Sequence, residues 1–110
     1  MPKFLRNWVF EEVQDFLANN YFVLLPHRPS DGSHHYFLGF VDGEQRLVEL
    51  QYHAKESIHP KTLKLCVIKK SGIPQECWLE YAQSGKKNVT YKGATSIPQG
   101  LLEKIKADRS

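Results

Sequence analysis

Two adjacent histidines, His34 and His35, follow a Gly-Ser pair and open an aromatic segment that continues to Val41. The ordinary pKa of histidine lies closest to neutrality, so a rigidly held imidazole can exchange protons at physiological pH. In a strand that starts here, neighbouring side chains point to opposite faces of the sheet. His35 would share one face with Phe37, and His34 the other with Tyr36. Only one imidazole can face a given site, and the chemistry indicated is acid–base catalysis.

The charge of the chain is divided unevenly between its halves. Residues 1–50 contain four basic and seven acidic side chains, a net charge of −3, whereas residues 51–110 contain eleven basic and five acidic ones, a net charge of +6. A basic half suits contacts with phosphate groups and therefore nucleic acid. A solvated, lysine-rich helix face explains the same composition without any partner. The charge alone leaves both interpretations open.

The composition indicates one folded domain outside the membrane. Of the 110 residues, 41% are hydrophobic and 25% are charged, which are ordinary values for a globular chain. Cys66 and Cys77 lack the spacing of metal ligands, and we expect reduced cysteines in the core. Neither a signal peptide nor an apolar run long enough to span a membrane is evident, so we expect a cytoplasmic protein.

The elements that must position the histidines follow from hydrophobic periodicity and turn residues. Residues 5–20 predict an amphipathic helix, and residues 21–25 a short strand. Residues 34–41 and 45–52 predict two strands joined by the hairpin turn Asp42-Gly43. Pro60 suits the first position of a second helix, which Gly72 would end. Its buried stripe would consist of Leu63, Val67 and Ile68, with Cys66 beside them.

The remaining residues predict a smaller C-terminal part. Pro74 starts a short helical turn that carries Trp78, which we expect in the core together with Trp8. Residues 83–95 are polar and predict an exposed linker or irregular strand. A capping-box pattern at Ser96 predicts a final helix to about residue 107. Its apolar stripe would either pack back on the domain or form a dimer contact, and it comprises Ile97, Leu101, Leu102 and Ile105.

These elements predict an α+β fold in two parts. Residues 1–81 would form a three-stranded antiparallel sheet with two helices on one face, in the order αβββα. The opposite face of the sheet would be left for solvent or a partner. Residues 82–110 would form an extension made of a linker and the terminal helix.

Three segments, taken in this order, resemble the HicA family of toxins. They are the Gly-Ser-His-His stretch at 32–37, the strand and histidine at 48–56, and the Pro-x-Thr-Leu helix start at 58–63 with its closing Gly-Ile near 72–73. The resemblance covers roughly residues 5–80. It implies a fold like that of double-stranded-RNA-binding domains and an endoribonuclease (mRNA interferase) that cleaves mRNA without a metal. It also implies a HicB-like antitoxin as the partner that holds the activity in check.

The resemblance assigns proton transfer to His35, because the family also tolerates asparagine at the position of His34. The 2′-hydroxyl of RNA can attack the adjacent phosphorus once a base takes its proton, and one positioned histidine contributes about 10²–10⁴-fold. Lysine or arginine near the phosphate would stabilise the developing charge. Candidate contacts with RNA or its phosphates are Arg28, Ser33, His34, His53, Lys55, Lys61 and Lys64.

Other roles for the histidines have less support. A metal site built from His34, His35 and His53 would lack the usual ligand spacing, so we expect neither a metal nor another cofactor. His27 and His59 belong to no motif and are expected at the surface.

The chain departs from the HicA pattern in several places. Asn20-Tyr21 stands where family members have a tight glycine turn, and residues 26–31 are inserted before Gly32. Gln51 and Lys61 replace a frequent proline and the glycine at the helix start. The extension after residue 81 has no counterpart in a minimal toxin. Substrate preference, and even activity, therefore stay open.

Two other functions are compatible with the same residues. One is a non-catalytic RNA-binding module of the same fold, which the altered loop before Gly32 would favour. The other is a protein-interaction domain in which residues 82–110 dock a partner or form a homodimer.

Overall fold

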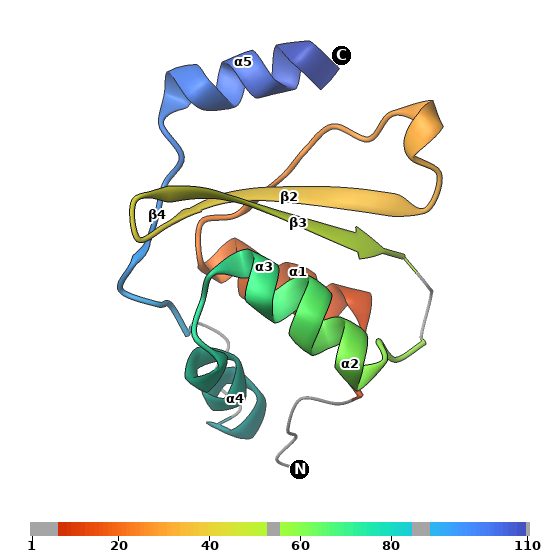
Figure 1. Ribbon diagram of the computed structural model, residues 1–110, viewed down its shortest axis with the longest axis vertical. Helices are drawn as coiled ribbons and strands as arrows, with labels where there is room; N and C mark the ends of the chain where they lie inside the picture. Colours follow the sequence, from red (N-terminus) through yellow and green to blue (C-terminus); the bar gives the residue numbers. More distant parts are fainter. Residues whose placement is uncertain (1–6, 53–55, 85–88, 110) are drawn as a thin grey trace.

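A long β-hairpin forms the centre of the fold (Figure 1). The computed structural model describes residues 7–52, 56–84 and 89–109, to which all structural statements here refer. Strands β2 (His34–Val41) and β3 (Glu44–Gln51) are antiparallel and paired along their whole length. Asp42 and Gly43 have φ values of 52° and 80°, the positive values that favoured two-residue hairpin turns require. The predicted hairpin is confirmed, with its second strand one residue earlier than expected.

Two short strands share the other edge of β2. Strand β1 (Val23–Leu24) pairs with residues 37–38 of β2, and β4 (Ala94–Thr95) pairs with residues 40–41. The sheet therefore has four strands, and the prediction of three is wrong. A strand of only two residues gives no alternating pattern that a sequence could reveal.

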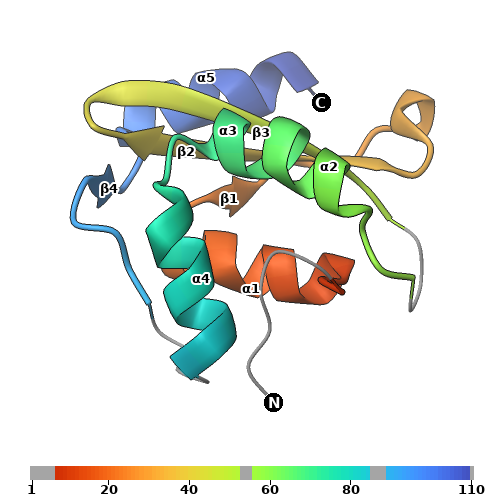
Figure 2. The same cartoon turned by 60° about the horizontal axis from the view of Figure 1, so that its bottom comes forward.

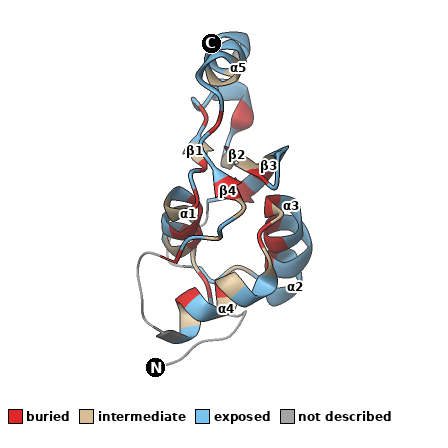
Figure 3. Cartoon of the chain, turned by 90° about the vertical axis from the view of Figure 1, so that its left-hand side faces the viewer, coloured by how far each residue is buried: buried red, intermediate tan, exposed pale blue. Residues whose placement is uncertain are grey.

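Two helices cover one face of the sheet, as predicted. They are α1 (Phe10–Asn19) and a continuous helix of residues 60–71, seen on either side in Figure 3. The second helix comprises α2 (Pro60–Thr62), the π-helical segment η2 (Leu63–Ile68) and α3 (Lys69–Ser71). Gly72 follows with a left-handed φ of 74°, which confirms the predicted helix end.

The main core lies between this face and the helices. Alternate residues of the hairpin point into it, and the apolar stripes of both helices meet them. The buried stripe predicted for the second helix is confirmed. Core residues from these elements include Val13, Phe16, Leu17, Phe37, Val41, Val48, Leu50, Leu63, Val67 and Ile68.

Helix α4 (Gln75–Ser84) closes this core from below (Figures 1 and 2). It is a longer helix than the short turn that Pro74 predicted. The Trp78 ring lies 4.2 Å from that of Phe16 and 5.5 Å from that of Trp8, measured between centroids. Both tryptophans are fully buried, which confirms their predicted place in the core.

Asn20 ties the segment after α4 to the end of α1. Its buried amide donates hydrogen bonds to the carbonyl oxygens of Phe16 (2.9 Å) and Val89 (3.2 Å). Its Oδ1 accepts one from the backbone N–H of Tyr91 at 2.7 Å. Val89 and Ala94 are buried and Ala94–Thr95 form β4, so the described part of 83–95 fits the alternative of an irregular strand rather than an exposed linker.

Helix α5 (Gln99–Arg109) lies on the opposite face of the sheet (Figure 3). Leu25, Leu38 and Ile97 are buried there, and three half-buried residues of α5 pack against them: Leu101, Leu102 and Ile105. The stripe of the terminal helix thus packs on its own domain, which was the first of the two alternatives. The face expected to be left for solvent or a partner is partly covered.

The two cysteines occupy different environments. Cys66 is exposed and Cys77 is half-buried, and both are free thiols. The expectation of a core position is therefore wrong for Cys66. Cys66 comes one residue before the buried Val67. Its side chain therefore points roughly a quarter of a turn around the helix axis away from the buried stripe.

Candidate active site

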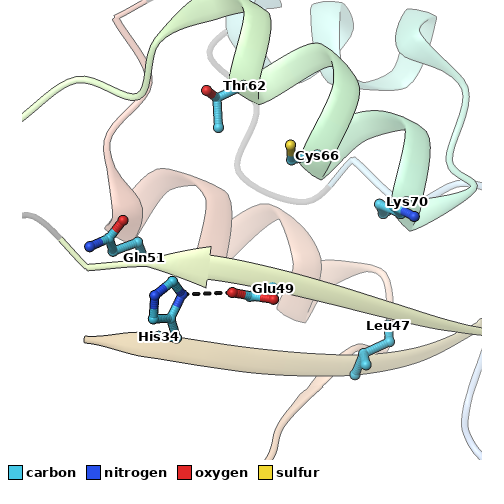
Figure 4. Close-up of a pocket in the computed structure, with 7 residues that line it drawn as sticks. All are labelled: His34, Leu47, Glu49, Gln51, Thr62, Cys66 and Lys70. Atoms are coloured by element: carbon cyan, nitrogen blue, oxygen red, sulfur yellow. Dashed lines mark ion pairs between the residues drawn. The ribbon is translucent and has the colours of Figure 1, made fainter. Parts of the chain in front are cut away.

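His35 lies near the start of β2, on the face of the sheet that the two helices cover. Its neighbour His34 points to the opposite face, as strand geometry predicts. There the Nδ1 atom of His34 lies 2.6 Å from Oε2 of Glu49, forming an ion pair when the imidazole is protonated (Figure 4). The two adjacent histidines are therefore separated by the thickness of the sheet.

Three aromatic rings surround the half-buried imidazole of His35. The Phe10 ring, from the start of α1, lies 5.3 Å away in an edge-on orientation, and the Tyr52 ring lies 6.4 Å away. The His27 ring is stacked on His35 at 4.7 Å with an interplanar angle of 29°. No described residue makes a hydrogen bond with either ring nitrogen of His35. Within the described part of the chain, packing alone therefore holds the imidazole, and its nitrogens are available to a ligand.

The surroundings of His35 lower its pKa. Burial is the largest cause, because it disfavours the charged imidazolium, and the neighbouring His27 acts in the same direction. Asp31 raises the pKa, and His34 lowers it by a smaller amount. A histidine with a lowered pKa is neutral at physiological pH and can accept a proton.

The inserted loop before Gly32 carries His27 to this position. Pro29–Asp31 form a single 3₁₀ turn, η1, whose start is capped because the Arg28 backbone N–H donates to Oδ2 of Asp31 at 3.0 Å. The Nε2 atom of His27 donates to the carbonyl oxygen of Gly32 at 2.7 Å. His27 is exposed, as expected, yet its contact with His35 was not foreseen. The Pro-Ser-Asp segment could have signalled the turn, but not the ring contact.

The predicted phosphate contacts are only partly brought together. The Arg28 guanidinium is engaged by the buried carboxylate of Asp31, with Nη2 and Oδ1 separated by 3.1 Å. The Ser33 hydroxyl accepts a hydrogen bond from Nε2 of Gln51 at 3.1 Å. Lys61 and Lys64 are exposed on the helix of residues 60–71. The predicted contacts His53 and Lys55 lie outside the described residues.

A cavity of about 310 Å³, a volume within the range of small-ligand sites, lies near His35, although His35 itself does not line it. Phe10 lines it and also contacts the His35 ring, and Leu50 lines it and is the cross-strand partner of His35. Its other lining residues are Gln51, Glu56, Ser57, Ile58, His59 and Thr62. His59 is exposed, as expected, and its Nδ1 accepts the backbone N–H of Lys61 at the start of α2.

A second, larger pocket runs along the edge of β3 (Figure 4). It has a volume of about 550 Å³ and lies beside His34 and Glu49 rather than His35. Leu47 and Gln51 of the strand also line it, together with Thr62, Cys66 and Lys70 of the neighbouring helix. This pocket shares Gln51 and Thr62 with the smaller cavity, but its lining includes His34 and not His35.

Two further properties concern the described part of the chain as a whole. Within it, no group of three or more histidine, cysteine, aspartate or glutamate side chains is arranged to hold a metal ion. None of its helices combines the length and apolar character that crossing a membrane requires.

Comparison with known proteins returned no match: no protein-family model, no curated protein and no solved structure is significantly similar to this chain.

Proposed function

We propose that this chain is an endoribonuclease similar to the HicA toxins and that His35 performs proton transfer in it. The observation that carries the proposal is the state of the His35 imidazole. Aromatic rings hold it in place, its nitrogens have no protein partner among the described residues, and its neighbours Phe10 and Leu50 line a cavity. A surface histidine without a role would not need such an enclosure.

The reaction would use the nucleophile that RNA itself contains. Attack by the 2′-oxygen forms a new O–P bond and breaks the P–O5′ bond, which leaves a 2′,3′-cyclic phosphate and a 5′-hydroxyl. His35 would accept the proton of the 2′-hydroxyl, for which its lowered pKa keeps it neutral. Cationic side chains near the phosphate would stabilise the charge that develops on its oxygens.

The helix of residues 60–71 would supply the electrostatic attraction for RNA. Four of its lysines are exposed, namely Lys61, Lys64, Lys69 and Lys70. Each lysine that contacts a phosphate releases counterions, so affinity for RNA would fall steeply with salt. Lys61 follows His59, which lines the cavity beside His35, so this end of the helix is nearest to the reaction.

We also propose a HicB-like antitoxin as the protein partner. An inhibitor of this reaction needs to cover His35 and would then bury Tyr52, whose ring lies next to it and is 41% exposed. Large aromatic side chains that are exposed beside a site are frequent anchors of protein interfaces. Co-expression with such a partner should relieve the growth arrest that the free toxin causes.

The test compares two substitutions at adjacent positions on opposite faces of the sheet. Purified wild-type protein, His35→Gln and His34→Gln are incubated with a defined single-stranded RNA in EDTA. We expect the wild type and His34→Gln to cleave at rates within about threefold of each other, and His35→Gln to be at least about 10²-fold slower. Equal cleavage by all three proteins would contradict the role of His35.

A second candidate function is RNA binding without cleavage. The exposed lysines of the 60–71 helix favour it, because they can contact phosphates whatever His35 does. Intact RNA in the experiment above, together with a gel shift that salt abolishes, would establish this function instead.

A further inference from the structure

His27 and His35 form a stacked pair that the inserted loop creates. Their ring centroids are 4.7 Å apart and the rings are nearly parallel. His27 belongs to the inserted loop, and His35 belongs to strand β2. His27 is the exposed member and His35 the half-buried one. A ligand that approaches His35 from solvent would therefore meet both imidazoles.

Two imidazoles at this distance affect each other's protonation. Like charges so close together repel each other, and His27 is accordingly the second-largest cause that lowers the pKa of His35. The half-buried ring is the costlier place for a charge, because it contacts Phe10 of the main core. Of the two rings, His35 is the one whose surroundings favour the neutral form.

The hydrogen bond of His27 fixes which of its nitrogens exchanges a proton. A carbonyl oxygen can only accept, so Nε2 of His27 carries hydrogen in its bond to Gly32. Nδ1 is then the ring nitrogen that this bond leaves available to a substrate. The capped turn η1 holds the backbone of this loop, and the bond to Gly32 holds the ring.

We propose that His27 is the general acid of this site and His35 the general base. The inference rests on the proposed ribonuclease function and deepens it. His35 takes the proton of the 2′-hydroxyl as the O2′–P bond forms, and Nδ1 of His27 gives its proton to O5′ as the P–O5′ bond breaks. One proton enters the pair and one leaves it, so the charge of the pair is unchanged.

Other charged groups around the pair do not replace either histidine. Asp31 is occupied by Arg28, and His34 lies on the opposite face beside Glu49. The phenol of Tyr52 faces His35 from the end of β3, and Glu56 and His59 line the neighbouring cavity. Among these groups, His27 is the one stacked directly on the His35 ring.

A substrate with an altered leaving group tests the role of the acid. Ordinary RNA is compared with RNA in which sulfur replaces the bridging 5′-oxygen, because a thiolate, with a conjugate-acid pKa of about 8.5, leaves without protonation. We expect His27→Gln to slow cleavage of ordinary RNA by about 10²-fold and of the sulfur substrate by less than about threefold. His35→Gln should slow both. Equal slowing of the two substrates by His27→Gln, or none, would overturn the proposal.

An NMR titration of the imidazole resonances separates this inference from the proposed function. We expect the pKa of His35 to rise in His27→Gln and to rise by a smaller amount in the matched variant His34→Gln, because His34 lowers this pKa less than His27 does. Circular dichroism confirms the fold of each variant. If wild-type protein cleaves neither substrate, the ribonuclease function is overturned, and with it the acid–base roles. If wild type cleaves while His27→Gln changes neither its rate nor the titration of His35, the role of His27 alone is overturned.

Discussion

The two faces of the sheet are covered to very different degrees. On the face of α1, the 60–71 helix and α4, the packed side chains are almost completely buried. On the face of α5, three residues are buried, the apolar residues of the helix are half-buried, and Leu47 remains 48% exposed. The first face holds His35 as well as most of the buried apolar surface. Stability and the proposed chemistry therefore depend on the same half of the molecule.

Truncating a ring in the aromatic centre of the well-covered face should cause the largest loss of unfolding free energy. Trp78→Ala removes a fully buried ring that contacts both Trp8 and Phe16. We expect the free energy of unfolding to fall by about 3–5 kcal/mol, because a cavity is left in addition to the lost burial. Urea denaturation followed by circular dichroism measures the change. A loss below about 1 kcal/mol would show that this face is packed less tightly than the structure indicates.

A polar contact at the margin of the same face comes next. Asn20→Ala deprives the carbonyl of Val89 and the N–H of Tyr91 of their side-chain partner. We expect a loss of about 2–3 kcal/mol, because unsatisfied buried polar groups carry a desolvation penalty. The matched control is Asn19→Ala, one residue earlier, where the backbone carbonyl, unchanged by this substitution, accepts the bond from Thr90. Similar losses in the two variants would argue against a specific role for the Asn20 amide.

The thinly covered face should tolerate truncation much better. Leu102→Ala shortens a half-buried side chain of α5, and about 1 kcal/mol of unfolding free energy should be lost, at the low end of core truncations. The same urea titration applies, and RNA cleavage should stay unchanged because α5 lies across the sheet from His35. A loss as large as that of Trp78→Ala would remove the contrast between the faces.

The smallest effect concerns pH. Because the pKa of His35 is lowered on folding, the unfolded chain binds more protons between the folded and the ordinary value of 6.5. Stability is then fully present above that window and decreases as pH falls through it. The unfolding free energy changes with pH by less than about 1.4 kcal/mol per pH unit, because only one proton is involved. We expect His35→Gln to flatten the pH dependence of unfolding between about pH 5 and 7, and an unaltered curve would contradict the shift.

Local signals predicted the hairpin well. Alternating residues and the Asp-Gly turn determine β2 and β3 with little help from the rest of the chain, and Gly72 similarly marks the end of its helix. The placement of His34 and His35 on opposite faces follows from strand geometry alone. These parts could be predicted because neighbouring residues define them.

The rest depends on contacts between distant residues. Strand β4 forms because β2 offers an unpaired edge, and Asn20 finds its partners about 70 positions later. Tyr21 adopts a left-handed φ of 67°. HicA proteins usually have a glycine turn at this place, and a tyrosine does not predict such a conformation. The stacking of His27 on His35 likewise needs the folded loop before it can be seen.

The bond network of Asn20 also has a consequence during protein synthesis. The end of α1 acquires its partners only after residue 91 has been added, although α1 and the hairpin are complete long before. Until then the amide of Asn20 is hydrated, and the apolar stripe of α1 is exposed to solvent or to other proteins. The nascent chain would thus lack these contacts while 71 further residues are added, a stage at which chaperones act.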